Sequence, residues 1–569
     1  MNAELLATSI AHELDVPHLI ARILVSRGCI SVAQAYERLH SSPSHVLNPL
    51  SEEFPMHGMK EALEWIDRAK KSGEKLCIFG DYDMDGLTGT ALLKRGLSEI
   101  GINASWHLPC RFGTGSGYGL SKDIVDQMLS EGVKYLLTVD TGITANAEIE
   151  YAKSQGMHVM VIDHHEPSGD GLPPSDVLLD PCQEECRYPN KSLCGAGVSY
   201  KFIDALLKKE GKGSAEKYLD LVALGTLADL VEMTPENRYL TRRGLSMLLN
   251  SKWPGVKELC RRQLESSPCV GGQDVLFRIA PIMNAPGRMD KPDAALELLL
   301  CDKVSDASVI LSRLSKYNDL RKKTEAEIST AAIAWVKERY GEEIPRVLVV
   351  DGKSWHPGVI GIVSAKVAQT FNRPAAVLTV ENGIAQASAR AVPGFNWHKA
   401  LFEVRDLFLR WGGHANAAGF SLKEEDIPEL RDRLQKLADD QNYQADGEAK
   451  EEDSERIPAA LNEITPTFMA AVQELEPFGG KNPYPILFAE NVQVEKLREL
   501  RGGHLQLKLS QSGSPVFPAI AFGMADAKKL IDRQHKKVSV AFEPIWNVYN
   551  GRKSIQLLIK AICENPTHG

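Results

Sequence analysis

The sequence predicts an α/β protein with two α/β lobes, a long helix between them and a small β-barrel towards the C-terminal end. Short apolar runs alternate with helical stretches over residues 76–162 and again over 346–440, which is typical of βαβ units around a buried sheet. The last hundred residues instead alternate apolar and polar positions, which is typical of strands with one buried face. These two patterns define the predicted fold class.

The first lobe begins with a helical pattern from Met59. Three apolar runs follow that predict strands, separated by stretches that predict helices. The strands are expected at 76–79, 135–139 and 157–162, and the helices at 87–100, 124–129 and 145–154. Residues 196–340 mostly follow a 3.6-residue period and end in a charged helix, 314–340, which we expect to connect two lobes over a narrow channel.

The second lobe starts with an apolar run at 346–350 and continues through 375–380 to about residue 440. Residues 446–455 contain six acidic residues and one Lys, so we expect an exposed linker there. Strands are then expected at 504–509, 538–542 and 555–559, which together favour a small β-barrel.

Length and composition exclude several classes of protein. The 569 residues are 43% hydrophobic and 25% charged, which fits three or four globular domains of about 150 residues. No apolar run approaches the roughly 18 residues of a membrane span, and residues 1–21 lack the basic region of a secretory signal. Ten scattered Cys favour a reduced, cytoplasmic protein. The net charge of −9 argues only weakly against a nucleic-acid partner, because acidic clusters away from a binding surface can supply it.

Acidic side chains follow each predicted strand of the first lobe. Because ligands bind at the carboxyl ends of parallel strands, these positions are candidates for a site. Three acids follow the first strand, one follows the second, an acid and two imidazoles follow the third, and a further acid lies in an apolar helical stretch: Asp81, Asp83, Asp85, Asp140, Asp163, His164, His165 and Asp229. A single Asp after a strand is usually a turn or capping residue, so the joint occurrence at three strand ends carries the prediction.

Carboxylate and imidazole ligands without thiolate suit Mn²⁺ or Mg²⁺ better than a structural zinc ion. Two such ions about 3.5–4 Å apart would activate a water and stabilise the leaving oxygen of a phosphate ester. An alternative zinc site at Cys182, Cys186 and Cys194 lacks paired CxxC spacing and an obvious fourth ligand, so free thiols are the default interpretation there.

Several motifs resemble those of known proteins. The segments 81–86, 139–142, 163–165 and 224–229 resemble the four motifs of the DHH phosphoesterase superfamily, and the glycine-rich 412–419 resembles the signature of its DHHA1 domain. Segments at 281–288, 355–358 and 476–479, with Asn482 and Pro483, narrow the similarity to the RecJ family of single-strand-specific 5′→3′ DNA exonucleases. The resemblance covers roughly residues 50–565.

The resemblance implies roles for the acidic cluster. Asp83 and Asp85 would bind different metal ions, Asp140 would bridge the two, and His164 with Asp229 would complete the second site. His165 would face the scissile phosphate, and we expect His165, Asp140 and Asp81 to act in catalysis. Many relatives carry a His at the position of Phe79. We therefore expect Asp81 or water to complete the ligands of the first ion.

The resemblance also implies a substrate grip in the second lobe. Arg288, Ser388 and Arg390 would hold the 5′-terminal phosphate, with Arg111 beside them, because the planar fork of arginine suits a phosphate dianion. His414 lies in a glycine-rich segment that would approach the sugar-phosphate backbone closely. The C-terminal strands would form an oligonucleotide-binding (OB) fold.

The implied organisation has six parts. They are an N-terminal helical segment (1–50), a DHH domain (51–300), a connecting helix (301–340), a DHHA1 domain (341–445), an acidic linker (446–456) and an OB-fold nucleic-acid-binding domain (457–569). The implied function is hydrolysis of single-stranded DNA from the 5′ end to mononucleotides by two divalent cations, in DNA repair and recombination. Family partners would be a single-strand-binding protein and a RecQ-type helicase, with no membrane association.

Two alternatives stay open at this point. A DHH/DHHA1 phosphodiesterase of short oligonucleotides or cyclic dinucleotides would usually be much shorter and would lack the C-terminal barrel. A non-catalytic single-strand-binding subunit would be expected to have lost the metal-binding carboxylates, whereas this sequence retains them.

Overall fold

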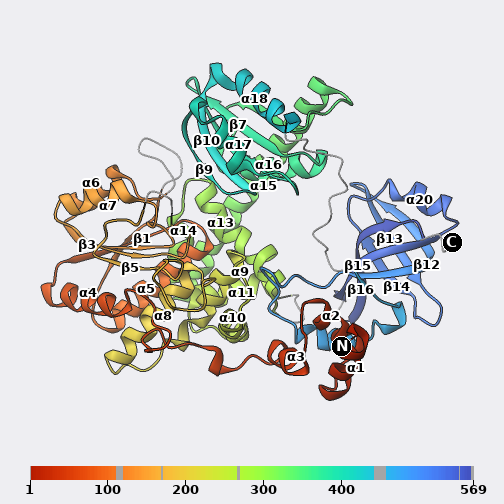
Figure 1. The fold of residues 1–569 in the computed structure, drawn as a ribbon, viewed down its shortest axis with the longest axis horizontal. Helices are drawn as coiled ribbons and strands as arrows, with labels where there is room; N and C mark the ends of the chain where they lie inside the picture. The colour runs from red at the N-terminus through yellow and green to blue at the C-terminus, as the bar shows by residue number, and fades with distance from the viewer. Residues whose placement is uncertain are drawn as a thin grey trace.

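A computed structural model describes residues 2–109, 119–167, 171–265, 270–440, 456–549 and 552–565. It contains three sheets, each in its own part of the chain (Figure 1). The predicted order of a parallel sheet, a long helix, a second α/β unit and a C-terminal barrel is confirmed. No helix in these described ranges is long and apolar enough to cross a bilayer.

The first domain is built on a parallel sheet with strand order β2-β1-β3-β4-β5. Its strands are β1 (Lys75–Gly80), β2 (Ser105–His107), β3 (Val133–Val139), β4 (His158–Ile162) and β5 (Val177–Leu179). Alternate residues of β1 face opposite cores, because Ile78 packs with α4 (Met59–Ser72) and α5 (Met84–Glu99) whereas Phe79 packs with α6 (Lys122–Ser130) and α7 (Asn146–Ser154). The carboxyl ends of β1, β3, β4 and β5 therefore meet along one edge.

The rest of this domain is helical, in agreement with the predicted 3.6-residue period. Its helices are α8 (Gly195–Lys209), α9 (Leu219–Ala228), α10 (Pro235–Met247), α11 (Pro254–Leu264), α12 (Gly272–Asp274), the π-helical turn η4 (Val275–Ile279), α13 (Ala280–Arg288) and α14 (Asp293–Leu300). The connecting helix α15 (Val304–Tyr340) starts ten residues earlier than the charged stretch predicts. Its first half packs in the core of the first domain and its second half in that of the next.

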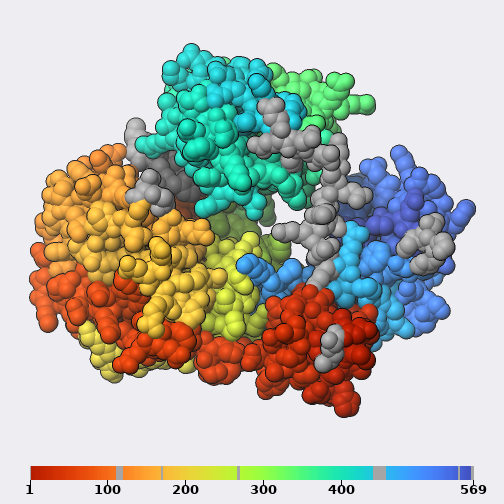
Figure 2. All heavy atoms as spheres, viewed as in Figure 1, coloured from red at the N-terminus to blue at the C-terminus, as the bar shows by residue number. Residues whose placement is uncertain are grey.

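The second domain has a mixed sheet with strand order β6-β7-β8-β10-β9, in which only β6 and β7 are parallel. Its elements are β6 (Leu348–Lys353), α16 (Pro357–Phe371), β7 (Ala375–Glu381), β8 (Ile384–Arg390), α17 (Trp397–Glu403), β9 (Phe408–Gly413), β10 (Ala417–Lys423) and α18 (Ile427–Asp440). The space-filling view shows a hollow between this domain, the green helices around α13 and the blue C-terminal unit (Figure 2).

The C-terminal strands close into a barrel, because β12 pairs with both β13 and β15. The elements are β11 (Ile457–Pro458), α19 (Pro466–Gln473), β12 (Leu487–Leu500), β13 (His504–Ser510), β14 (Phe517–Ala521), α20 (Ala527–Arg533), β15 (Lys537–Tyr549) and β16 (Arg552–Cys563). The N-terminal helices α1 (Ala3–Glu13), α2 (His18–Ser26) and α3 (Val32–Leu39) share one hydrophobic cluster with these strands. The two ends of the chain thus fold together as one unit.

Candidate metal centre

The ends of β1, β3 and β4 and the end of α9 bring seven predicted residues into one cluster. Three groups of side chains have ligand atoms that lie within 4.8 Å of one another inside each group. The groups overlap, because Asp140 and His164 each belong to two of them. The groups are Asp140 with His164 and His165, Asp85 with His164 and Asp229, and Asp81 with Asp83 and Asp140. Asp140 belongs to the group with Asp81 and Asp83, and its Oδ1 atom lies 3.0 Å from His164 Nε2 of the group with Asp85 and Asp229, so it lies between the two as a bridging ligand would.

The first motif is shaped by the start of α5. Asp83 is the N-cap residue of that helix and accepts hydrogen bonds from the backbone N–H groups of Asp85 (3.0 Å) and Gly86 (3.2 Å). Asp85 lies one residue inside the helix, is 1% exposed, and accepts from the N–H groups of Gly195 (2.5 Å) and Ala196 (3.0 Å) at the start of α8. The two carboxylates are thus fixed by backbone donors of two helices.

Close packing around Asp85 depends on a glycine in the fourth motif. A Cβ atom at Gly225 of α9 would lie 2.5 Å from Asp85 Oδ1, which is too close for any side chain at this position unless Asp85 moved. Asp229 is the C-cap residue of the same helix. Gly225 therefore lets α9 approach close enough for Asp229 to reach the cluster.

His164 joins the strands to this cluster. Its Nε2 atom lies 3.0 Å from Asp140 Oδ1, 3.6 Å from Asp229 Oδ2 and 3.7 Å from Asp85 Oδ2. Asp140 follows β3 with a φ of 60°, in the left-handed region that Asp and Asn tolerate better than most residues. One imidazole nitrogen among three carboxylates from different elements is an arrangement suited to metal coordination.

The electrostatics of the cluster favour binding of a cation. Burial and the charges of Asp85 and Asp83 raise the pKa of Asp140 well above its usual range, and the same causes raise the pKa of Asp229 to about 8. Burial and Asp85 also raise the pKa of Asp83. Carboxylates gathered this closely repel one another unless positive charge is supplied. Oxygen and imidazole donors fit Mn²⁺ or Mg²⁺, so the residues present suit the predicted ions.

His165 is held by Asp163, a buried candidate acid to which the sequence assigned no specific role. Asp163 is fully buried, and its Oδ1 atom lies 2.8 Å from His165 Nδ1 while its Oδ2 accepts from the Ile143 N–H (2.9 Å). Although burial acts in the opposite direction, the hydrogen bond and charge of Asp163 raise the pKa of His165 to about 9. A ring nitrogen of His165 lies within 4.8 Å of the ligand atoms of Asp140 and His164, where a positively charged ring would attract phosphate.

A further buried acid, Asp180, was missed because its strand, β5, is only three residues long. Its Oδ1 accepts from the Cys182 N–H (2.7 Å), whereas Oδ2 has no hydrogen-bond partner among the described residues. Burial raises its pKa to about 7. The rule of acids at strand ends would have found Asp180 had the strand been recognised.

The cysteines form no zinc site in the part of the chain that the structure describes. None of the ligand groups there includes a thiol. Cys182 Sγ donates to the carbonyl of His164 (3.3 Å), and Cys194 Sγ lies 3.5 Å from Thr226 Oγ1. Cys182, Cys186 and Cys194 are all free thiols.

The predicted substrate residues lie in the second domain and at the boundary with it. Arg288 ends α13, and its Nη1 donates to the carbonyl of Gly358 in the first turn of α16 (3.4 Å). Arg390 Nη1 donates to Ser388 Oγ (3.1 Å), and a Cβ atom at Gly361 would lie 2.9 Å from that hydroxyl. Arg288, Ser388 and Arg390 therefore surround the N-terminal end of α16.

The two remaining predicted residues are placed differently. His414 is exposed in the turn between β9 and β10, and its N–H donates to Ala417, which pairs with Arg390 in the sheet. It therefore lies at the Arg390 end of the sheet. Arg111 falls outside the described residues.

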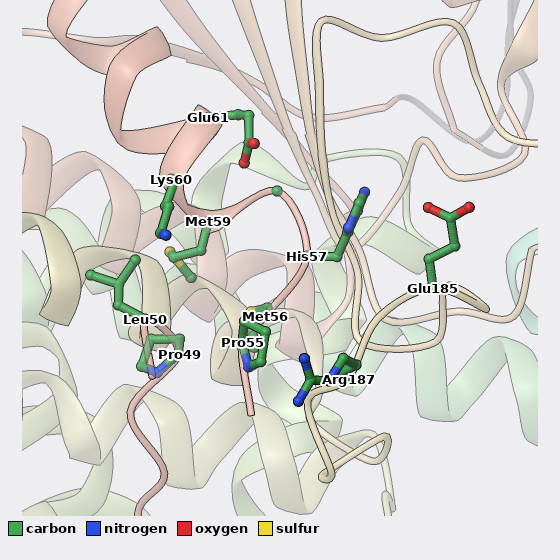
Figure 3. Close-up of a pocket in the computed structure, with 11 residues that line it drawn as sticks. Pro49, Leu50, Pro55, Met56, His57, Met59, Lys60, Glu61, Glu185 and Arg187 are labelled. Atoms are coloured by element: carbon green, nitrogen blue, oxygen red, sulfur yellow. The ribbon is translucent and has the colours of Figure 1, made fainter. Parts of the chain in front are cut away.

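A separate cavity of about 180 Å³ opens beside the first turn of α4 (Figure 3). Its charged side chains are of both signs, Lys60 and Arg187 against Glu61 and Glu185, and His57 also lines it. None of these is among the predicted site residues, so the cavity and the acidic cluster use different side chains.

Comparison with known proteins identifies three families along the chain. Residues 75–226 match the DHH family N-terminal domain, 345–440 the DHHA1 domain and 457–561 the RecJ OB domain. Two relatives named single-stranded-DNA-specific exonuclease RecJ are similar over nearly the whole chain. The one from Bacillus subtilis is 34% identical over 97% of this chain and 69% of its own length, and the one from Salmonella typhimurium 32% identical over 96% of each.

The structure agrees with these matches. The crystal structure of RecJ from Thermus thermophilus in complex with Mn²⁺ superposes with a TM-score of 0.79 and 26% identity, covering 99% of this chain and 78% of that one. Sequence, domain order and three-dimensional fold thus lead to the same assignment. The chain belongs to the RecJ family of DHH proteins.

Proposed function

We propose that the chain is a metal-dependent, single-stranded-DNA-specific exonuclease that degrades DNA 5′→3′ to mononucleotides, in DNA repair and recombination in the cytoplasm. One observation carries the proposal: seven carboxylate and imidazole side chains converge at one sheet edge in a chain whose relatives are named for this activity. The C-terminal barrel favours this function over that of the shorter phosphodiesterases.

We assign the ligands from the geometry of the cluster. Asp81 and Asp83 would hold one divalent cation and Asp85, His164 and Asp229 the other. Asp140, which belongs to the first group and lies 3.0 Å from His164, would contribute to both. When bound, the two cations would activate water and neutralise charge on the leaving oxygen. Asp163 holds His165 in position, and His165 would bind the scissile phosphate through Nε2. With Asp81 in the first group, a His at position 79 is not needed.

The 5′ preference is proposed to come from the residues around α16. Arg288, Arg390 and Ser388 lie next to the start of this 15-residue helix, whose first N–H groups carry partial positive charge. A terminal phosphate carries more charge and more free oxygens than a phosphate within the chain. A site with two arginines and a helix N-terminus therefore favours the end of a strand.

The barrel would bind the strand farther from the cut. Phe522 is 59% exposed and lies edge-on to His504, with ring centroids 5.2 Å apart, so an aromatic surface is available for base stacking. A single-strand-binding protein and a RecQ-type helicase are the proposed partners, and co-purification with each would test them.

We expect Arg390→Ala to weaken binding of 5′-phosphorylated oligonucleotides by about 10- to 100-fold, because a charged hydrogen bond contributes about 1.5–3 kcal/mol. Oligonucleotides with a 5′-hydroxyl should lose much less. Measuring KM for both substrates tests the role. Arg433→Ala is the matched control, because Arg433 pairs with Asp406 on the surface of the same domain. An equal loss for the two substrates would contradict the phosphate-binding role of Arg390.

A further inference from the structure

The C-terminal unit touches the first domain through a short segment, residues 475–482, that has no role in the reaction described above. The sequence singles it out by the residues Glu476, Pro477, Phe478, Gly479 and Asn482. In Figure 1 it belongs to the blue chain that reaches from the barrel towards α9 and α11. Its contacts are with the residues that come after Asp229 and with the start of the helical run that ends at Arg288.

The segment is a preformed loop. Asn482 is 2% exposed, and its Nδ2 donates to the carbonyls of Leu475 (3.1 Å) and Pro477 (2.8 Å). Its Oδ1 accepts from Arg27 Nη1 at the end of α2 (3.1 Å), and its backbone exchanges two hydrogen bonds with Gly479. The loop therefore has a hydrogen-bond network of its own besides its contacts with the first domain.

One side of the loop forms backbone contacts with the turn after Asp229. The carbonyl of Gly480 accepts from the Met233 N–H (3.1 Å), and Gly480 forms a β-bridge with Glu232. The fit is close, because a Cβ atom at Gly480 would lie 1.9 Å from the carbonyl oxygen of Leu230. Leu230 itself has a φ of 58°, a strained conformation for a leucine that the surrounding structure must hold in place.

The other side of the loop fixes the start of the helical run 272–288. Glu476 Oε2 accepts from the N–H of Gly272 (3.2 Å) and from the N–H of Phe478 (2.6 Å). From Gly272 the chain continues without a break through α12, η4 and α13 to Arg288. The loop therefore contacts two elements, one holding a proposed metal ligand and one a proposed phosphate ligand.

Two arginines of α10 also hold the loop. Arg238 is 3% exposed and its Nη1 donates to the carbonyl of Leu475 (3.1 Å). Arg242 Nη2 donates to the carbonyls of Glu474 and Glu476 (2.6 Å each). Because α10 directly follows the Asp229 turn, the loop and the turn are tied to the same helix.

We propose that residues 475–482 are a positioning element for Asp229, and so for the second metal ion; this inference rests on the proposed function. Asp229 has a side chain 28% exposed, against 1% for Asp85 and 4% for Asp140, and it ends its helix. The position of a ligand at a helix end depends on the next few residues of the chain, and binding requires a geometry held to within about 0.5 Å. The loop supplies that restraint from the C-terminal unit.

Gly480→Ala in the full-length protein tests this. The added Cβ cannot fit without moving Leu230. The affinity for Mn²⁺, measured by isothermal titration calorimetry, should therefore fall by about 10- to 100-fold, as it does when residues that support a metal ligand are replaced. The kcat on a single-stranded oligonucleotide should fall with it and recover partly at high Mn²⁺, with little change in KM for DNA. Lys481→Ala is the control, because its exposed ion pair with Glu232 (2.8 Å) leaves the backbone contact intact; it should match the wild type.

Unchanged Mn²⁺ affinity in a folded Gly480→Ala variant, or a loss confined to KM, would overturn the proposal. If circular dichroism shows that this variant does not fold, Glu476→Ala and Glu476→Gln decide. Gln keeps an acceptor for the Gly272 N–H, so only the Ala variant should lose Mn²⁺ affinity; equal affinities would reject the proposal. A wild-type protein that neither binds Mn²⁺ nor degrades DNA would instead refute the proposed function.

Discussion

Asp140→Asn should lower exonuclease turnover by at least about 10³-fold while leaving the fold intact. Asp140 belongs to the group with Asp81 and Asp83 and lies 3.0 Å from His164 of the other proposed group, so its loss should affect both metal ions at once. The effect should therefore exceed the roughly 10- to 100-fold loss typical of residues that only support a ligand. Asn is a better replacement than Ala, because the φ of 60° at this position suits Asn.

The same variant should be more stable than the wild type when divalent metal is absent. Burial and the neighbouring carboxylates raise the pKa of Asp140 in the folded chain, so keeping it ionised at neutral pH costs free energy of folding. A neutral Asn removes that cost, and the thermal unfolding midpoint in EDTA should rise. Active sites commonly carry such a stability penalty.

Single-turnover rates with excess Mn²⁺ and thermal unfolding with EDTA check the two expectations. Asp204→Asn is a matched control, since Asp204 is a carboxylate of the same domain that pairs with Lys208 away from the cluster. A rate for Asp140→Asn within a few-fold of the wild type would contradict the bridging assignment. A lower unfolding midpoint in EDTA would contradict the repulsion argument.

Glu236→Ala should lower the free energy of unfolding by about 3–5 kcal/mol, because it removes the carboxylate that pairs with the buried ammonium group of Lys201. Lys201 and Glu236 are 1% and 2% exposed, and their charged atoms are 2.9 Å apart. Tyr188 Oη (2.7 Å) and Asn190 Nδ2 (3.1 Å) donate to the same carboxylate. The network joins α8, which fixes Asp85, to α10, which follows Asp229.

Urea denaturation monitored by circular dichroism measures this change. Glu236→Gln keeps an acceptor oxygen for these donors and should lose less than the Ala variant. Below its unfolding transition, Glu236→Ala should retain a kcat near that of the wild type, since the network touches none of the proposed ligands. A loss below about 1 kcal/mol would show that the buried pair contributes little to stability.

Ligands bind at the carboxyl ends of parallel strands, and this explains why much of the acidic cluster could be predicted. Parallel strands end at one edge, so acids after β1, β3 and β4 must lie close together whatever the rest of the chain does. Asp229 was a candidate only as an acid in an apolar helical stretch, because its approach to the cluster depends on the packing of Gly225 against Asp85. Asp180 was missed with its short strand, since three residues show no usable periodicity.

Local sequence patterns could not predict the contacts between distant parts of the chain. Nothing in the amphipathic helices of residues 3–39 indicates that they complete the core of a barrel at the other end of the chain. The predicted N-terminal segment 1–50 therefore contributes helices to the C-terminal unit. The role of the loop 475–482 likewise depends on hydrogen bonds to Met233 and Gly272, which spacing along the sequence cannot show.

Digestion of one oligonucleotide carrying a label at its 5′ or 3′ end tests the central claim most directly. With Mn²⁺ and single-stranded substrate, the 5′ label should be released first as a mononucleotide, and EDTA should abolish the reaction. The same sequence in a blunt duplex should resist digestion. Release starting from the 3′ label, or undiminished activity in EDTA, would contradict the account of a two-metal enzyme that holds single-stranded DNA by its 5′ end.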